Sequence, residues 1–553
     1  MDMPKKPPKA KAASNPRKRK APTEEEPRAT RRSGRIAGVK ADPVKLEEFR
    51  QEEARVREEQ RVKDRRLREQ VMTVGEQMEE DSAPVEQLVE LLKNMPVCER
   101  PDAKSVKDAY PEKEGDKELE RLKEQFKGMH LAANKKVTTE RVYTMLVHPD
   151  PTKNLVLVGD KYGQLGIWDA PTGEAADAKE ETKPDVKKEE GEEAQEEDED
   201  GRVWRMQAHA KNSISCMKVD PVNGQSLVTS SYDCTLRRLD FSTGVSTEVF
   251  AFEDEDNLIN HFDLVPTGQE AWLVDKNGGI SHADFREKGE RRRWEVQEAG
   301  RGAKLGGCSV NRESCGPHST TSLSYQTRPE ANRPALMPHL LVTAGNDQHV
   351  RIWDTRHLKK LSPKSVETIL PPKQEEGKEY IDTHCESSIP YERMQGYMES
   401  KSGKGLLRAS YQHGKSCSAA YWDPFGRRIL TTSYDDKLRV FNVNPQQLMF
   451  DTPLPASQFK PTKAIAHNCQ TGRWLTILRA QWSQNTEFTP HFSVGNMKRR
   501  LDVFSSGGER IVSLWNEAVT AVPAVTAAHP AHVNRLVGGN TSGRIQLWTS
   551  GAE

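Results

Sequence analysis

The residues best suited to chemistry form a short string that begins at His413. His413-Gly-Lys-Ser416 resembles the end of a phosphate-binding P-loop, and Cys417 follows it as a possible nucleophile. A P-loop requires glycine where Ala409 stands and a helix after its serine, whereas here the sequence continues as an alternating strand. Cys417 falls within that strand, no third residue is positioned to orient His413, and cysteine is commonly a small core residue. The string is not expected to be catalytic.

No stronger catalytic or metal-binding pattern occurs elsewhere in the chain. The sequence contains no Gly-x-Ser-x-Gly or His-Glu-x-x-His motif, and its eight cysteines form no Cys-x-x-Cys pair. This usage predicts a reduced intracellular protein that is not an enzyme, with no cofactor and no metal. No apolar run is long enough for a secretion signal or a bilayer span, so a soluble protein is expected.

Cations and aromatic residues recur instead beside short strand patterns. The set comprises Lys161, Lys211, Lys276, Lys304, Lys415, Tyr434, Arg473, Trp474 and Lys498. Positive side chains with interleaved rings suit a nucleic-acid backbone, and the rings can stack on displaced bases. Ordinary surface lysines are the alternative interpretation. Cooperation between these residues requires a fold that brings all of them to one face.

The segment Leu341–Arg356 indicates such a fold. An apolar run is followed by a Gly-Asn-Asp turn and an alternating strand that ends at Trp353-Asp354. Two strands joined in this way are typical of the inner half of a WD-type propeller blade. A single blade cannot bury its own faces, so the chain must contain further copies.

Seven copies of this pattern are present. They occupy residues 155–169, 227–240, 272–286, 341–356, 430–441, 492–504 and 536–548. We therefore predict an all-β fold, a seven-bladed WD-repeat β-propeller spanning residues 130–553. The third and sixth copies are degenerate, with Ala283 and Lys498 in place of an aromatic and an acidic turn residue. Since little sequence follows Trp548, ring closure must use a strand that precedes Arg141.

Such a ring places the cationic and aromatic set at one mouth of its central channel. The loops before each innermost strand and the turns between the next two strands share that end, and every member of the set falls in one of them. Two histidine–aspartate pairs, His209 with Asp233 and His413 with Asp435, are expected to be structural hydrogen bonds that orient turns.

Polar segments flank and interrupt the repeats. Residues 1–43 are predicted to be a disordered basic tail and residues 44–129 a charged helical or disordered extension. Residues 170–200, 312–338 and 357–408 are predicted to be insertions that are disordered or mobile. Leu88–Leu92 and Leu119–Phe126 have the spacing of short amphipathic helices that rest on the propeller or bind a partner. Two basic clusters suggest a nuclear-import signal or a phosphate-binding arm: Lys5, Lys6, Arg17, Lys18, Arg19 and Lys20.

Four phrases carry a resemblance to a known family: Gly414–Pro424, Ser433–Asp436, His467–Leu475 and His282–Arg286. They resemble the fungal DNA damage-binding WD-repeat proteins of the "changed mutation rate" type over about residues 130–553. The resemblance implies a nuclear, chromatin-associated protein that binds double-stranded DNA and prefers ultraviolet-damaged duplex. Lys211, Lys304, Lys415 and Arg473 are then expected to contact phosphates, with Trp474 or Tyr434 near the bases.

A rival function rests on the segment Ile352–Arg356. Trp353, Asp354 and Arg356 resemble the Trp-Asp-x-Arg box by which some propellers dock on the adaptor of cullin-RING ubiquitin ligases, and Asp284–Arg286 is a partial second copy. This resemblance implies a substrate receptor or a histone-binding scaffold. The same residues also suit a purely structural role at the end of a blade.

Overall fold

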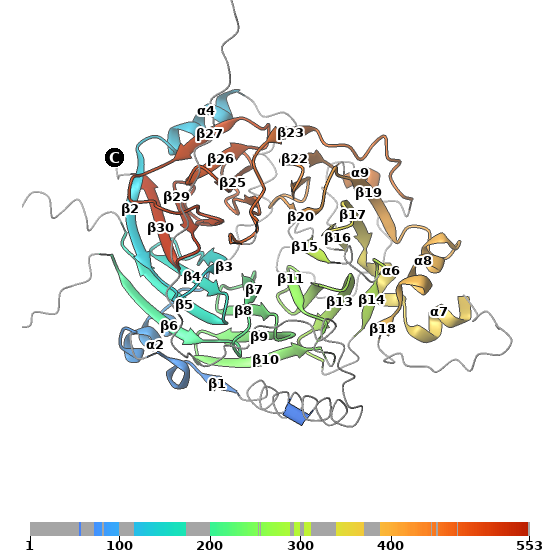
Figure 1. The fold of residues 1–553 in the computed structure, drawn as a ribbon, viewed down its shortest axis with the longest axis horizontal. Coiled ribbons are helices and arrows are strands. Elements are labelled where there is room, and N and C mark those ends of the chain that lie inside the picture. Colours follow the sequence, from blue (N-terminus) through green and yellow to red (C-terminus); the bar gives the residue numbers. More distant parts are fainter. Residues whose placement is uncertain are drawn as a thin grey trace, which may run out of the picture. The chain divides into compact units, whose positions relative to one another are not determined.

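Seven β-sheets form a closed ring in the computed structural model (Figure 1). The described residues are 55–56, 71–79, 82–98, 116–172, 200–252, 254, 256–287, 292–298, 304–310, 339–369, 388–443, 445–448, 452–472 and 474–550. The ring belongs to a compact unit that spans Lys63–Glu553. Of the other unit, Met1–Val62, only residues 55–56 are described, and they are helical.

Blades 1 to 4 follow one another along the chain, each built from its innermost strand outward. Blade 1 contains β3 (Val142–Val147), β4 (Asn154–Asp160), β5 (Gln164–Ala170) and β6 (Arg202–Gln207). Blade 2 contains β7 (Ile214–Val219), β8 (Ser226–Ser231), β9 (Thr235–Asp240), β10 (Val245–Ala251) and β1 (Met72–Thr73). Blade 3 contains β11 (Ile259–Leu264), β12 (Glu270–Asp275), β13 (Gly279–Asp284), β14 (Arg293–Glu295) and β18 (Ser388–Ile389). Blade 4 contains β15 (Leu305–Val310), β16 (Leu340–Gly345), β17 (His349–Asp354) and β19 (Leu407–Gln412).

Blades 5 to 7 complete the ring. Blade 5 contains β20 (Cys417–Trp422), β21 (Arg428–Ser433), β22 (Lys437–Asn442) and β23 (Lys463–Ala466). Blade 6 contains β24 (Gln481–Trp482), β25 (His491–Asn496), β26 (Arg500–Ser505) and β27 (Arg510–Leu514). Blade 7 contains β28 (Val525–Ala528), β29 (Arg535–Gly539), β30 (Arg544–Ser550) and β2 (Met129–Lys136). Each of the seven predicted repeats is the middle hairpin of one blade, which confirms the propeller.

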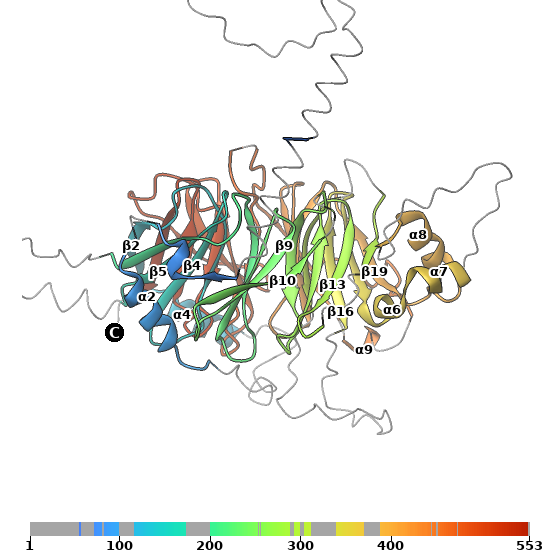
Figure 2. The same ribbon diagram turned by 90° about the horizontal axis from the view of Figure 1, so that it is seen from below.

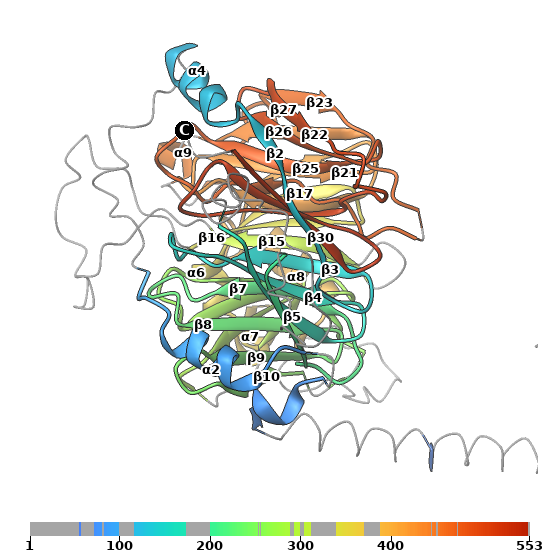
Figure 3. The same ribbon diagram turned by 90° about the vertical axis from the view of Figure 1, so that its left-hand side faces the viewer.

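Ring closure also follows the prediction. The strand β2 comes from before Arg141 and pairs antiparallel with β30, from Met129 opposite Ser550 to Lys136 opposite Arg544 (Figure 3). The two degenerate repeats form ordinary hairpins, because Ala283 is buried within β13 whereas Lys498 points to solvent in the β25–β26 turn. Backbone pairing and burial therefore tolerate both substitutions.

The core lies between neighbouring sheets, where each blade buries its faces. Trp353 shows the arrangement: its ring is 1% exposed, packs with Trp272 and Trp294, and donates from Nε1 to the Thr343 hydroxyl at 2.8 Å. Burying a large aromatic side chain in this way stabilises the fold by about 2–3 kcal/mol before its hydrogen bond is counted. The Trp-Asp closing motif is thus part of the core.

Two helices before the ring pack against it. Helix α2 (Val85–Lys93) follows the short helix η1 (Gly75–Gln77) and buries Leu88 and Leu92 against blades 1 and 2. Helix α4 (Asp116–Gln125) places Leu122 and Phe126 against blades 6 and 7. The amphipathic spacing of both segments is therefore used to cover the propeller. Within the described ranges, no helix is long and apolar enough to cross a membrane.

The predicted disorder of residues 357–408 is wrong for 357–369 and 388–408. These residues contribute to α6 (Thr355–Lys360), α7 (Pro363–Ile369), β18 and α8 (Tyr391–Glu399), which lie outside blades 3 and 4 (Figure 2). Leu358, Val366, Met394 and Tyr397 are buried in the core cluster of Trp353, so the segment gains enough apolar burial to order itself. A further short helix, α9 (Pro445–Leu448), follows β22. Insertions 170–200 and 312–338 lie almost entirely outside the described residues.

One of the two predicted histidine pairs is present. His209 contacts Asp233 at 2.9 Å through Nδ1 and the Thr229 hydroxyl at 2.8 Å through Nε2. The predicted direct bond from His413 to Asp435 is wrong, since Arg439 lies between them and donates to His413 Nδ1 at 3.0 Å and to Asp435 at 2.9 and 2.6 Å. The guanidinium of Arg439, which lies in β22, takes the carboxylate that a histidine usually holds.

Candidate nucleic-acid interface

Antiparallel pairing places all described members of the predicted set at one end of the ring. We call this end the rim: it carries the turn between the second and third strands of each blade and the connection into each innermost strand. The opposite end is called the base. The rim positions are Lys161 in the β4–β5 turn, Lys211 before β7, Lys276 in the β12–β13 turn, Lys304 before β15, Lys415 before β20, Tyr434 in the β21–β22 turn, Trp474 before β24 and Lys498 in the β25–β26 turn. Arg473 lies outside the described residues.

The rim side chains differ in how freely they meet solvent. Lys211, Lys276, Lys415 and Lys498 are exposed, and Trp474 is 79% exposed. The ammonium of Lys161 lies 4.4 Å from the ring centre of Tyr162 and 2.9 Å from its hydroxyl, a contact that raises the pKa of Lys161. Tyr434 is half-buried, with its hydroxyl 3.3 Å from that of Thr471. The exposed lysines are free to reach a ligand, whereas Tyr434 is held in the structure.

Lys304 occupies a distinct environment at the channel mouth. Burial, together with the positive charges of Arg479 and Lys276, lowers the pKa of its ammonium to about 8. No described carboxylate forms an ion pair with any of these three cations, so their charges are not balanced locally. Unbalanced positive charges in a partly buried site favour an anionic ligand.

Arg479 was not among the site residues predicted from the sequence. It stands in the apolar run Leu475–Ala480, just before β24, and its Nε is buried without a hydrogen-bond partner. Burial lowers the pKa of its guanidinium, but the nearby hydroxyls of Tyr421 and Tyr232 more than offset this and raise it. An arginine interrupting the approach to an innermost strand was the available signal, because that position faces the channel rather than the apolar core.

The connection from β23 to β24 carries Trp474 and Arg479 across the mouth. Its Thr476 hydroxyl donates to the carbonyl of Val142 in blade 1 at 2.5 Å, and its Gln470 amide donates to the carbonyl of Tyr434 at 2.5 Å. These bonds anchor the connection at blades 1 and 5. The tertiary structure thus holds both residues of this segment at the rim, with Arg479 lining the central channel.

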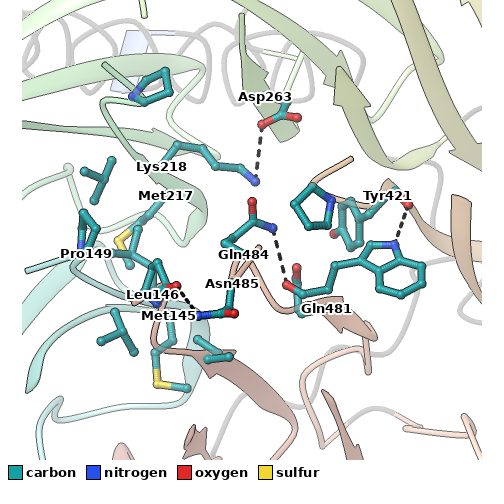
Figure 4. A pocket seen from close by; sticks show the side chains of 18 of the residues that line it. Met145, Leu146, Pro149, Met217, Lys218, Asp263, Tyr421, Gln481, Gln484 and Asn485 are labelled. Carbon is teal, nitrogen blue, oxygen red and sulfur yellow. Dashed lines mark hydrogen bonds and ion pairs between the residues drawn. The ribbon is translucent and has the colours of Figure 1, made fainter. Parts of the chain in front are cut away.

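A cavity of 1280 Å³ occupies the central channel below Arg479 and extends to the turns of the base (Figure 4). Lys218 of blade 2 and Asp263 of blade 3 form an ion pair at 3.4 Å on its wall. His261 Nε2, also on the wall, lies 3.3 Å from the Tyr421 hydroxyl. Burial raises the pKa of the neighbouring Cys216 thiol, which therefore stays protonated near neutrality. In the part of the chain that is described, no three potential metal ligands come together.

Acidic residues make the charge of the rim vary from blade to blade. Exposed carboxylates stand at Glu140, Asp254, Asp256, Glu298 and Glu517, on the connections leading into blades 1, 3, 4 and 7. Blade 6 is the clearest contrast, since three consecutive exposed cations, Lys498, Arg499 and Arg500, run from the β25–β26 turn into the start of β26. The rim is therefore mixed in charge, and its positive groups are most concentrated at the channel mouth and at blade 6.

The predicted adaptor-docking residues lie at the base. Trp353 and Asp354 are buried, and Asp354 accepts from the backbone and guanidinium of Arg356 at 3.0, 3.0 and 2.6 Å. The Arg356 side chain remains 42% exposed. Two of the three residues are therefore structural, and only Arg356 presents a surface. The predicted import residues between Lys5 and Lys20 lie outside the described ranges.

Known proteins with similar sequences identify the family. The family model "WD domain, G-beta repeat" matches residues 201–238 and 405–442. A protein of Cryptococcus neoformans named DNA damage-binding protein CMR1 is 54% identical over 94% of this chain and 88% of its own length. Proteins with the same name in Mycosarcoma maydis and Neurospora crassa are 30% and 29% identical over 98% of this chain and 93% and 92% of their own lengths. The chain therefore belongs to the family of WD-repeat proteins named DNA damage-binding protein CMR1.

Proposed function

We propose that this protein binds double-stranded DNA through the rim, prefers ultraviolet-damaged duplex, and acts in the nucleus on chromatin without catalysing a reaction. The observation that carries the proposal is the group of Lys276, Lys304 and Arg479, three cations without a described carboxylate partner at the channel mouth. The name shared by the relatives supports a DNA ligand linked to damage. The basic clusters between Lys5 and Lys20 support nuclear import.

The exposed lysines of the rim would neutralise phosphates. Such contacts release counterions and position the duplex without reading its sequence. This suits a protein that must recognise damage in any sequence context. The β23–β24 connection, held to blades 1 and 5, would then present Trp474 to the duplex held by the lysines.

Selectivity for damaged DNA would come from the cost of deforming the duplex. A lesion weakens stacking at its base step, so opening that step costs less than it does in intact DNA. Trp474, 79% exposed at the rim, could then contact the opened step. Intact duplex would bind through phosphates alone, and damaged duplex would gain the stacking contact.

The decisive experiment compares intact and irradiated duplex of one sequence in a fluorescence anisotropy titration with the full chain. We expect both to bind and the irradiated duplex to bind more tightly, and Trp474→Ala should reduce the affinity ratio towards one. Equal affinity for the two duplexes would contradict the damage preference. Absence of binding at low salt would contradict the proposal as a whole.

A second candidate function is docking on a cullin-RING ligase adaptor or on histones. It is favoured by two neighbouring arginines of the base, Arg286 in blade 3 and Arg356 in blade 4. Their side chains are 59% and 42% exposed, and each is bonded to the aspartate two residues before it. Since these arginines lie at the end of the ring opposite the lysines, docking there would leave the rim free for DNA.

A further inference from the structure

Two exposed tryptophans stand on the connections that lead into and out of blade 6. Trp474 is 79% exposed and Trp515 is 51% exposed, whereas large apolar side chains elsewhere in the ring are mostly buried. Trp515 directly follows β27, and the pairing of Leu501 with Leu514 places it at the strand end opposite Arg500. It therefore reaches the rim beside the turn that carries Lys498, Arg499 and Arg500.

The backbone at Gly495 shows how closely the two tryptophan-bearing connections approach this turn. A β-carbon on Gly495 would lie 1.9 Å from the carbonyl oxygen of Pro523 and 3.3 Å from Leu478 Cδ2. Pro523 belongs to the connection that begins at Trp515, and Leu478 belongs to the one that contains Trp474. Both connections thus meet at the end of β25, next to the turn, and glycine is required for them to fit.

The charges of the turn are available to a ligand. Lys498, Arg499 and Arg500 are exposed, and none forms an ion pair with another described residue. Glu517 stands two residues after Trp515, yet it has no ion pair with these cations either. The surface made of Lys498, Arg499, Arg500, Trp474 and Trp515, which we call the blade 6 patch, therefore combines three free cations with two free aromatic faces.

We infer that the blade 6 patch binds unpaired DNA at the point where a single strand leaves a duplex held by the exposed rim lysines, Lys498 among them. In a duplex the base faces are covered by their neighbours, so an exposed indole can stack only on a base that has left the helix. Stacking on such bases tolerates any sequence, and the three cations match the adjoining phosphates. The inference rests on the proposed function, because it assigns one sector of the same rim to gaps, flaps and opened lesions.

Tryptophan fluorescence gives a direct test. Of the ten tryptophans in the sequence, Trp474 and Trp515 are the exposed ones, and the other eight are buried. Titration of the full chain with oligo(dT) should quench the solvent-accessible part of the emission. Trp515→Ala should remove part of this quenching and weaken oligo(dT) binding about 5- to 150-fold, the range for loss of one stacked base. Trp515→Phe should restore most of the affinity, since it retains an aromatic face.

The control is Val222→Ala, which removes a 50% exposed apolar side chain from the base. It should leave oligo(dT) affinity unchanged, and intact duplex should bind the Trp515→Ala variant as well as it binds the wild type. Unchanged oligo(dT) affinity and quenching in Trp515→Ala, with duplex binding intact, would overturn the inference but not the proposed function. Tighter binding of oligo(U) than of oligo(dT) would assign the patch to RNA and also overturn it. Loss of duplex binding in the wild type would instead refute the proposed function.

Discussion

Replacing the four exposed rim lysines Lys211, Lys276, Lys415 and Lys498 by alanine should flatten the salt dependence of duplex binding. Each phosphate neutralised by a cation contributes about 0.9 to the slope of log K against log salt, so four contacts contribute about 3.6. Raising the salt concentration from about 50 to about 200 mM would then reduce the duplex affinity of the wild type about 150-fold more than that of the variant. The side chains are exposed, so each replacement should change the free energy of unfolding by no more than about 0.5 kcal/mol.

The assay is fluorescence anisotropy with one intact duplex at four or five salt concentrations. The matched control replaces Lys401, Lys404, Lys460 and Lys463, which are exposed, lie at or towards the base and remove the same total charge. We expect the control to keep the wild-type slope. An unchanged slope in the rim variant would refute the assignment of these lysines to phosphates. Equal flattening in both variants would show that net charge, and not the rim, governs binding.

Three further outcomes are expected. Because the pKa of Lys304 is about 8 and an anion favours its charged form, duplex affinity should fall as pH rises from 7 to 9, and Lys304→Arg should remove that fall in an anisotropy titration. Asp233→Asn should lower the free energy of unfolding in urea by about 1–3 kcal/mol at pH 7, since it weakens a buried bond to His209. Burial acts to raise the pKa of Asp233, but His209 lowers it overall; the stabilisation is therefore present above about pH 4, and the two proteins should converge as the pH falls through the lowered pKa. Arg356→Ala should abolish co-purification of ligase adaptor subunits if the base docks there, with unchanged duplex affinity; retention of the subunits would leave Arg356 without a docking role.

The repeats could be recognised in the sequence because each blade is specified by residues that lie close together in the chain. Alternating strands, turn residues and the Trp-Asp closure at 353–354 recur along the chain, and one blade cannot bury its faces without its neighbours. The seven hairpins and the closing strand β2 could therefore be predicted. The order in 388–408 could not, because Met394 and Tyr397 are isolated apolar residues in a polar insertion and become core residues only against Trp353.

The candidate site, like the fold, could be predicted from the sequence only in part. The sequence by itself determined which turns share the rim, since antiparallel pairing within each blade fixes the end at which every turn must lie. Only the tertiary structure decided which charges act together: residues as distant in the chain as Lys276 and Arg479 meet at the channel mouth, and Trp515 reaches the turn of Arg500 through strand register. Charge and stacking depend on distance in space, and the closure of the ring sets those distances.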